Sequence, residues 1–151
     1  MSLTFTLQPV LNYRQRIVES LEMALARLLR AEQDTLKDIA MLREVEHDLF
    51  ADLAARQQGL IDLTVVFQLR AQLKTVGARL AVHTRTLNEV RQQIANVRTE
   101  IVNAQQEKET LENLKAKEEA KWQLAEAARE ARERDDIYIA RAHRLQEADH
   151  V

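Results

Sequence analysis

The sequence contains no cysteine, a single proline (Pro9) and only two glycines among its 151 residues. The lack of cysteine excludes disulfide bonds, thiol catalysis and cysteine-ligated metals. The scarcity of glycine and proline leaves few places for turns, which argues against a β-sheet protein. Aromatic residues make up 4% of the chain, whereas Ala, Leu, Glu, Gln, Arg and Lys are abundant, and these residues favour helices. We therefore expect long, uninterrupted helices.

The chain also lacks an excess of charge of either sign, because its formal net charge is −2. This balance argues against bulk attraction to nucleic acid or to an anionic membrane. A basic segment followed by an apolar stretch, as in a secretion signal, is missing from the start, and no apolar run reaches transmembrane length. We expect a soluble, cytoplasmic protein without direct membrane insertion.

Apolar residues recur in alternating steps of three and four along two segments of the chain, which is the heptad pattern of a coiled coil. The first stripe comprises Val18, Leu21, Leu25, Leu28, Glu32, Thr35, Ile39, Leu42, Glu46, Leu49 and Leu53. The second stripe comprises Leu69, Leu73, Val76, Leu80, His83, Leu87, Val90, Ile94, Val97, Ile101 and Ala104. The polar members interrupt the hydrophobic seam and are expected to specify its register more than to stabilise it.

The only turn signal between the two stripes is the segment 56–62. Gly59 suits the left-handed conformation that ends a helix, and Asp62 suits the cap that begins the next one. Folding the chain there pairs the leucines of the two stripes, for example Leu53 with Leu69, so that paired residue numbers sum to 122. The agreement of two independently located stripes favours an antiparallel hairpin over a parallel dimer.

The distribution of charge favours the same pairing. Residues 32–56 carry a net charge of −4, and the facing residues 65–90 carry +3. Six basic residues lie along the second segment without interleaved aromatics, so we expect them to pair with the acidic helix rather than with nucleic acid. These residues are Arg70, Lys74, Arg79, Arg85, Arg91 and Arg98.

The predicted fold is all-α: a two-helix antiparallel coiled-coil hairpin with a longer, projecting C-terminal helix. We predict one domain over residues 1–151, with helices at about 8–57 and 64–145 and a turn at about 58–63. Because Leu11 would pair with Leu111, residues 112–145 would have no partner and would project as a single helix. A helix that folds back or frays is the alternative for this segment.

Patterns for catalysis are scarce in the sequence, and we predict no enzyme activity and no cofactor. The Glu-x-x-His pattern occurs twice, ending at His47 and at His150, which resembles part of a di-iron site. The two copies are far apart in the predicted register, so a metal site is not expected. His83 lies in the seam opposite Ile39, where a register-fixing role is favoured over a pH switch.

Several segments resemble the FliJ family of the flagellar type III export apparatus. They are Phe5-Thr-Leu-Gln-Pro-Val-Leu-Asn-Tyr-Arg14, Leu111-Glu-Asn-Leu-Lys-Ala-Lys117 and Asp135-Asp-Ile-Tyr-Ile-Ala-Arg141, together with the coiled coil between them. The resemblance implies a stalk similar to the γ subunit of rotary ATP synthases, which inserts into a hexameric export ATPase and stimulates it. It also implies contacts with the cytoplasmic domain of the export gate protein and with export chaperones, at the flagellar base beside the inner membrane.

The resemblance further implies two sets of contact residues. For the ATPase ring these are Tyr13, Arg14, Trp122, Arg129, Arg132, Tyr138 and Arg141. For the export gate these are Phe67, Leu69, Leu73, Val76 and Leu80. Three alternatives stay open: the equivalent stalk of a virulence injectisome, a coiled-coil scaffold or tether without an ATPase partner, and a hairpin that opens onto lipid. The last is disfavoured because the seam is narrow and the polar faces are not notably basic.

Overall fold

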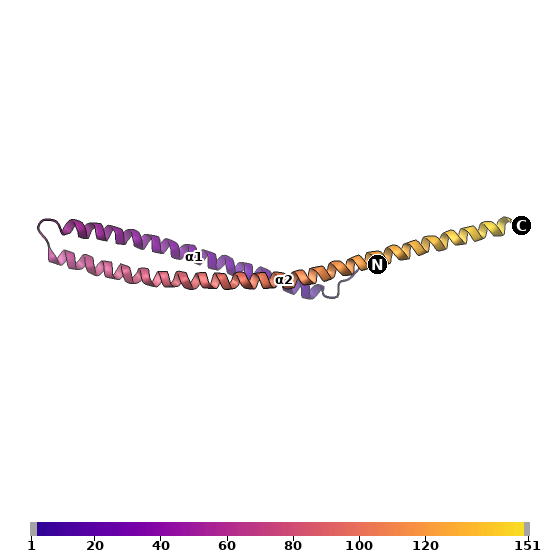
Figure 1. Ribbon diagram of the computed structural model, residues 1–151, viewed down its shortest axis with the longest axis horizontal. Coiled ribbons are helices and arrows are strands. Elements are labelled where there is room, and N and C mark those ends of the chain that lie inside the picture. Colours follow the sequence, from indigo (N-terminus) through magenta and orange to yellow (C-terminus); the bar gives the residue numbers. More distant parts are fainter. Residues whose placement is uncertain (1–2, 150–151) are drawn as a thin grey trace. The chain divides into compact units, whose positions relative to one another are not determined.

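Two long helices account for nearly all of the chain in the computed structural model, which describes residues 3–149 (Figure 1). Helix α1 spans Gln8–Arg56 and helix α2 spans Leu63–Asp149. The described residues contain no strand. The prediction of an all-α protein with two long helices packed against each other is confirmed. Helix α2 extends four residues beyond the predicted end at 145, and the connecting segment, residues 57–62, begins one residue earlier than predicted.

The chain divides into two compact units. Unit 1 comprises Met1–Arg16 and Ala104–Val151, and unit 2 comprises Ile17–Asn103. Each helix therefore contributes to both units. The prediction of a single domain over residues 1–151 stays a prediction.

Unit 2 contains the parts of α1 and α2 that pack along the predicted seam. Glu32 Oε2 accepts a bond of 3.2 Å from Arg91 Nε, and nearer the loop Val45 and Val76 line the same depression. Contacts that advance along α1 thus move backwards along α2, so the helices run in opposite directions within this unit. The numbers of these facing residues add up to within one of 122, as the heptad pattern predicts. Every residue of the two stripes that lies in unit 2 is buried or half-buried.

The loop between the helices has the glycine turn and the helix cap that the sequence predicted. Gly59 adopts a φ of 77°, in the left-handed region that other residues rarely enter. Asp62 Oδ1 accepts a hydrogen bond of 3.0 Å from the backbone N–H of Thr64, so it caps the first turn of α2. Together these two residues reverse the chain within six residues.

Two polar residues of the seam, Thr35 and Glu32, have bonding partners within unit 2. Thr35 is buried, and its Oγ1 donates a hydrogen bond of 2.8 Å to the carbonyl of Ala31 one turn earlier. The side chain of Glu32 is 19% exposed and forms the ion pair with Arg91. No buried side-chain nitrogen or oxygen among the described residues is left without a hydrogen bond. The seam therefore includes polar groups without the large penalty of an unpaired buried one.

Unit 1 includes a short non-helical segment before α1 that ends in a turn. The carbonyl of Phe5 accepts a bond of 3.1 Å from the N–H of Gln8, and the Phe5 side chain is only 5% exposed. Leu3 and Phe5 line a depression together with Lys115 and Glu119 of α2. Pairing thus continues beyond the Leu11–Leu111 level at which the sequence predicted its end.

The last part of α2 lies in unit 1 as well. From Ala127 to Asp149 every residue is exposed. Its projection as a single helix stays a prediction.

Candidate interaction surfaces

The residues predicted for contact with an export gate differ widely in accessibility. Leu69 and Val76 are buried, and Leu73 and Leu80 are half-buried, because all four belong to the seam of unit 2. Phe67 is 62% exposed, since it lies on another face of the helix. Of this set only Phe67 offers most of its surface to a partner.

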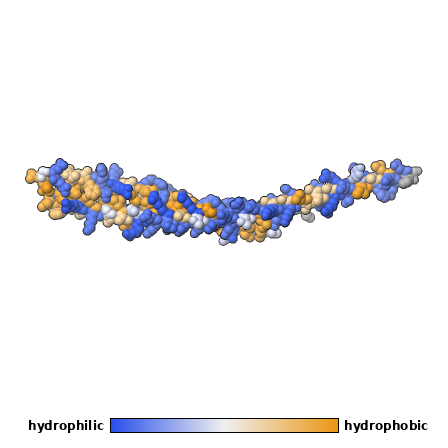
Figure 2. Space-filling model, in the orientation of Figure 1, coloured by the Kyte–Doolittle hydropathy of each residue, from blue (hydrophilic) through white to orange (hydrophobic). Residues whose placement is uncertain are grey.

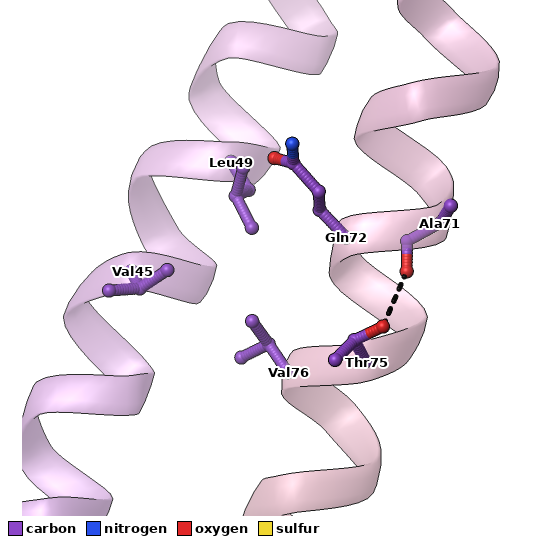
Figure 3. Close-up of a pocket in the computed structure, with 6 residues that line it drawn as sticks. All are labelled: Val45, Leu49, Ala71, Gln72, Thr75 and Val76. Atoms are coloured by element: carbon purple, nitrogen blue, oxygen red, sulfur yellow. Dashed lines mark hydrogen bonds between the residues drawn. The ribbon is translucent and has the colours of Figure 1, made fainter.

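A groove along unit 2 provides a more accessible apolar surface beside those residues. We define the hairpin groove as two open depressions that share Val45. The first has a volume of about 390 Å³ and is lined by Val45, Leu49, Ala71, Gln72, Thr75 and Val76 (Figure 3). The second is lined by Asp38, Met41, Leu42, Val45, Arg79 and His83. Val76 is the only predicted gate residue that lines the groove.

The two depressions of the groove are both lined mainly by apolar surface. In Figure 3, Thr75 Oγ1 donates a hydrogen bond of 3.1 Å to the carbonyl of Ala71, so the hydroxyl is satisfied within its own helix. Valine and leucine side chains supply much of the remaining lining of this depression. Asp38 and Arg79 add a carboxylate and a guanidinium to the second depression. The groove therefore suits a peptide segment with apolar side chains.

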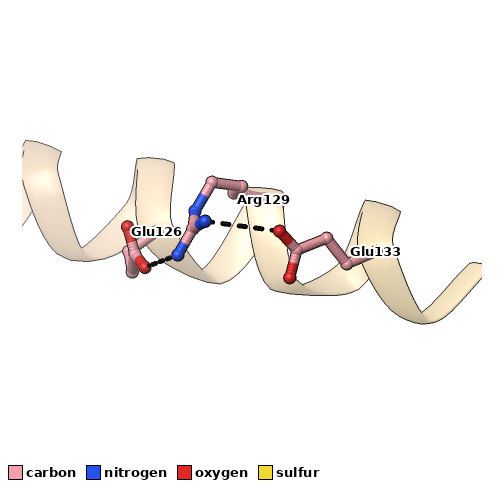
Figure 4. Close-up of polar contacts among 3 residues, drawn as sticks. All are labelled: Glu126, Arg129 and Glu133. Carbon is pink, nitrogen blue, oxygen red and sulfur yellow. Dashed lines mark hydrogen bonds and ion pairs between the residues drawn. The ribbon is translucent and has the colours of Figure 1, made fainter. Parts of the chain in front are cut away.

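The residues predicted for contact with an ATPase ring all lie in unit 1. Tyr13 and Tyr138 are exposed and Trp122 is half-buried. Arg14 forms an ion pair with Glu107 of α2. Arg129 lies between Glu126 and Glu133 and contacts both, the latter at 3.3 Å (Figure 4). Arg132 and Arg141 are exposed and form no ion pair with any residue of 3–149.

The structure does not bring this set together at one place. Arg14 meets α2 at Glu107, and Tyr138 lies 31 residues further along the same helix. At 1.5 Å per residue this separation is about 46 Å, so the two residues cannot share one contact. The set separates into a pair at the start of α1 and a group along residues 122–141.

Within the second group, the carboxylates of the helix already engage one predicted cation. The hydrogen bond from Arg129 lowers the pKa of the Glu126 carboxyl, and the same contact raises the pKa of the Arg129 guanidinium. Arg129 would have to exchange these partners to bind a carboxylate of another protein. The i,i+3 and i,i+4 spacings of Glu126 and Glu133 were visible in the sequence, and they signal this engagement.

The sequence predicts no metal site at the two copies of the Glu-x-x-His pattern. His150 lies outside the described residues. No group of three or more His, Cys, Asp or Glu side chains in residues 3–149 is arranged to hold a metal ion. No described helix is both long enough and apolar enough to cross a membrane.

Two long helices packed along a seam that polar residues interrupt define an all-α, coiled-coil protein. The chain matches the sequence model of the flagellar FliJ protein family over residues 3–147. It therefore belongs to that family, as its sequence segments indicated. Comparisons with curated proteins and with solved structures find no match. The family indicates a role related to flagellar export and is not a family of known enzymes.

Proposed function

We propose that this protein is the coiled-coil stalk of the flagellar type III export apparatus. In this role it binds and stimulates the hexameric export ATPase and links it to the export gate protein and to export chaperones. Its place would be the cytoplasm, at the flagellar base beside the inner membrane. The observation that most supports the proposal is the family match over residues 3–147 of a chain whose α2 ends in a fully exposed stretch.

The ATPase contact is assigned to the exposed end of α2 in unit 1. Residues 127–149 combine Arg132, Arg141 and Tyr138 with a row of small and apolar side chains on a continuous helix. An exposed helix of this kind can enter a narrow opening, because no other described segment covers it. Exposed arginine and tyrosine are also frequent at protein interfaces.

The gate contact is assigned to the hairpin groove of unit 2. A linear segment of the gate's cytoplasmic domain could place apolar side chains over Val45 and Val76 without opening the seam. Phe67 supplies a further exposed aromatic residue early in α2. Leu69, Leu73 and Leu80 then act indirectly, by holding the helices that form the groove.

The proposal is tested by steady-state ATP hydrolysis of the cognate export ATPase with and without the full chain. We expect stimulation by the full chain and its loss in a chain that ends at Ala127. The double variant R132A/R141A should reduce the stimulation. Its matched control, R85A/R98A, removes two exposed arginines of unit 2 and should stimulate like the natural sequence. If neither the full chain nor its variants bind the ATPase, the chain is a tether with another partner.

A further inference from the structure

The end of α2 in unit 1 carries large apolar side chains along one exposed face. Leu124, Tyr138 and Leu145 are 73%, 76% and 68% exposed. Their separations are multiples of seven residues, so they lie on the same face of the helix. Three exposed alanines complete this terminal face: Ala127, Ala131 and Ala142. Figure 2 shows apolar residues on either side of a hydrophilic stretch in this end of α2.

The spacing of the terminal face reads the same in both directions along the helix. Its successive steps are three, four, seven, four and three residues. A second copy of the same helix, laid antiparallel, therefore places an apolar residue opposite each of the six. Facing residue numbers add up to 269, which gives the pairs Leu124 with Leu145, Ala127 with Ala142 and Ala131 with Tyr138.

The sizes of the facing side chains favour the antiparallel direction. Each Tyr138 lies opposite Ala131 of the second copy, and the small alanine leaves room for the ring. A parallel pair in register would instead place tyrosine against tyrosine and alanine against alanine, which leaves gaps between the alanines. Because a twofold axis relates the two copies, every antiparallel contact occurs twice.

The charges beside the terminal face are complementary in the same arrangement. Glu130 and Arg141 lie on one flank of the face, and Arg132 and Asp135 lie on the other. The twofold axis puts equal flanks together, so Glu130 of one copy meets Arg141 of the second copy, and Arg132 meets Asp135. None of these four side chains forms an ion pair with any residue of 3–149. Residues 124–145 carry five basic and five acidic side chains, so pairing brings no net charge together.

One residue opposes the pairing. Arg134 occupies the heptad position between Ala131 and Tyr138, and in the antiparallel register it lies beside Arg134 of the second copy. The pair is also short, since residues 124–145 span about 33 Å of helix. Contacts of this length fall at the small end of protein interfaces. Both features favour an association that forms and separates readily.

We propose that the end of α2 pairs antiparallel with the end of α2 from a second copy of the chain, over residues 124–145. The pair covers Tyr138 and Arg141, which are assigned above to the ATPase. The paired form therefore cannot engage the ring, and the ATPase must displace the second copy. This regulatory consequence rests on the proposed function, whereas the pairing itself does not.

Sedimentation equilibrium of the purified full chain, without ATPase, tests the pairing. We expect a monomer–dimer equilibrium. The variant L124S/L145S should weaken dimerisation about tenfold or more, because four leucines leave the pair. Arg134→Leu should strengthen it about tenfold, because a like-charge contact disappears and the heptad stripe becomes continuous. The matched control V82S/V102S removes two exposed apolar residues of unit 2 and should dimerise like the natural sequence.

Charge exchange tests the flanking contacts. Glu130→Arg and Arg141→Glu should each weaken dimerisation, because each brings like charges together across the pair. The combined variant E130R/R141E restores opposite charges and should dimerise like the natural sequence. Circular dichroism should show the same helix content for all three variants.

Cysteine crosslinking tests the direction of the pair, since the natural chain has no cysteine. The variant A127C mixed with A142C should form a disulfide-linked dimer under mild oxidation. A127C alone should not, because its two copies would lie about 22 Å apart along the helix. Parallel pairing predicts the reverse.

Three results would overturn the inference. The full chain could sediment as a monomer at every concentration, L124S/L145S could dimerise as well as the natural sequence, or A127C could crosslink to itself as readily as to A142C. A monomeric chain that stimulates the ATPase would contradict the pairing alone. A dimerising chain that never stimulates the ATPase would contradict the proposed function alone. When both hold, the crosslinked pair should stimulate hydrolysis only after its disulfide is reduced.

Discussion

Glycine occurs twice in the chain, and the two positions impose opposite requirements on the backbone. Gly59 has a φ of 77°, which an alanine adopts only with strain, although no atom lies within 4 Å of the added carbon. We expect Gly59→Ala to lower the free energy of unfolding by about 1 kcal/mol. Urea denaturation followed by circular dichroism measures this difference.

Gly77 is the matched control, because it lies within α2 and also has open space around its Cα. Gly77→Ala should raise the free energy of unfolding by about 0.5 to 1 kcal/mol, since alanine restricts the unfolded chain and favours the helix. Equal effects of the two substitutions would contradict the conformation assigned to the loop.

A second prediction at this scale concerns the titration of Glu126. The hydrogen bond from Arg129 lowers the pKa of this carboxyl, so Arg129→Gln should raise it towards its ordinary value. Because the pKa is lower in the helix than in the unfolded chain, the stabilisation is complete above the unfolded pKa. It disappears as the pH falls through the lowered pKa. NMR titration of the carboxyl carbon measures the shift, and Arg132→Gln is the control that should leave it unchanged.

At the scale of the helices, the apolar stripes predicted the seam of unit 2 residue by residue. The stripes were readable because a coiled coil repeats one geometry over many turns, so each heptad reports on the same interface. The loop was equally readable, since Gly59 and Asp62 are the only residues in the region with turn and capping chemistry.

Other features of the elements could not be predicted from periodicity. The burial of Phe5 was missed because the segment before α1 is too short to show a repeat. The hairpin groove was missed because a heptad pattern assigns residues to faces but does not say where the gap between two helices stays open. Exposed side chains such as Met41 and Val45 lie beside the seam rather than in it.

The short segment before α1 gives a prediction at the scale of an element. Phe5 is nearly fully buried in unit 1, at the level of Lys115 and Glu119, so its removal should release the start of α1. Phe5→Ala should speed the hydrogen exchange of backbone amides at residues 11–14 about tenfold or more. Amides of the seam in unit 2 should exchange as before, and Phe5→Leu should restore most of the protection. Unchanged exchange at residues 11–14 would contradict the packing of Phe5.

At the scale of the whole molecule, the proposed function assigns different partners to the two units. The exposed end of α2 in unit 1 is assigned to the ATPase, and the hairpin groove of unit 2 to the export gate. Through its family resemblance the sequence pointed to residues in the exposed end of α2, but in the groove it pointed to Val76 alone. Accessibility then separates residues that can touch a partner, such as Tyr138 and Phe67, from residues that only hold the fold, such as Leu69.

Site-specific photo-crosslinking of the full chain in a flagellated cell tests whether the two units contact these different partners. A photoreactive residue at Tyr138 is predicted to crosslink to the export ATPase, and one at Phe67 to the cytoplasmic domain of the export gate. A photoreactive residue at Val102, which is exposed but belongs to neither surface, serves as the control. Crosslinks from Tyr138 to proteins other than the ATPase or a second copy of the chain, or the same products from all three positions, would contradict the assignment.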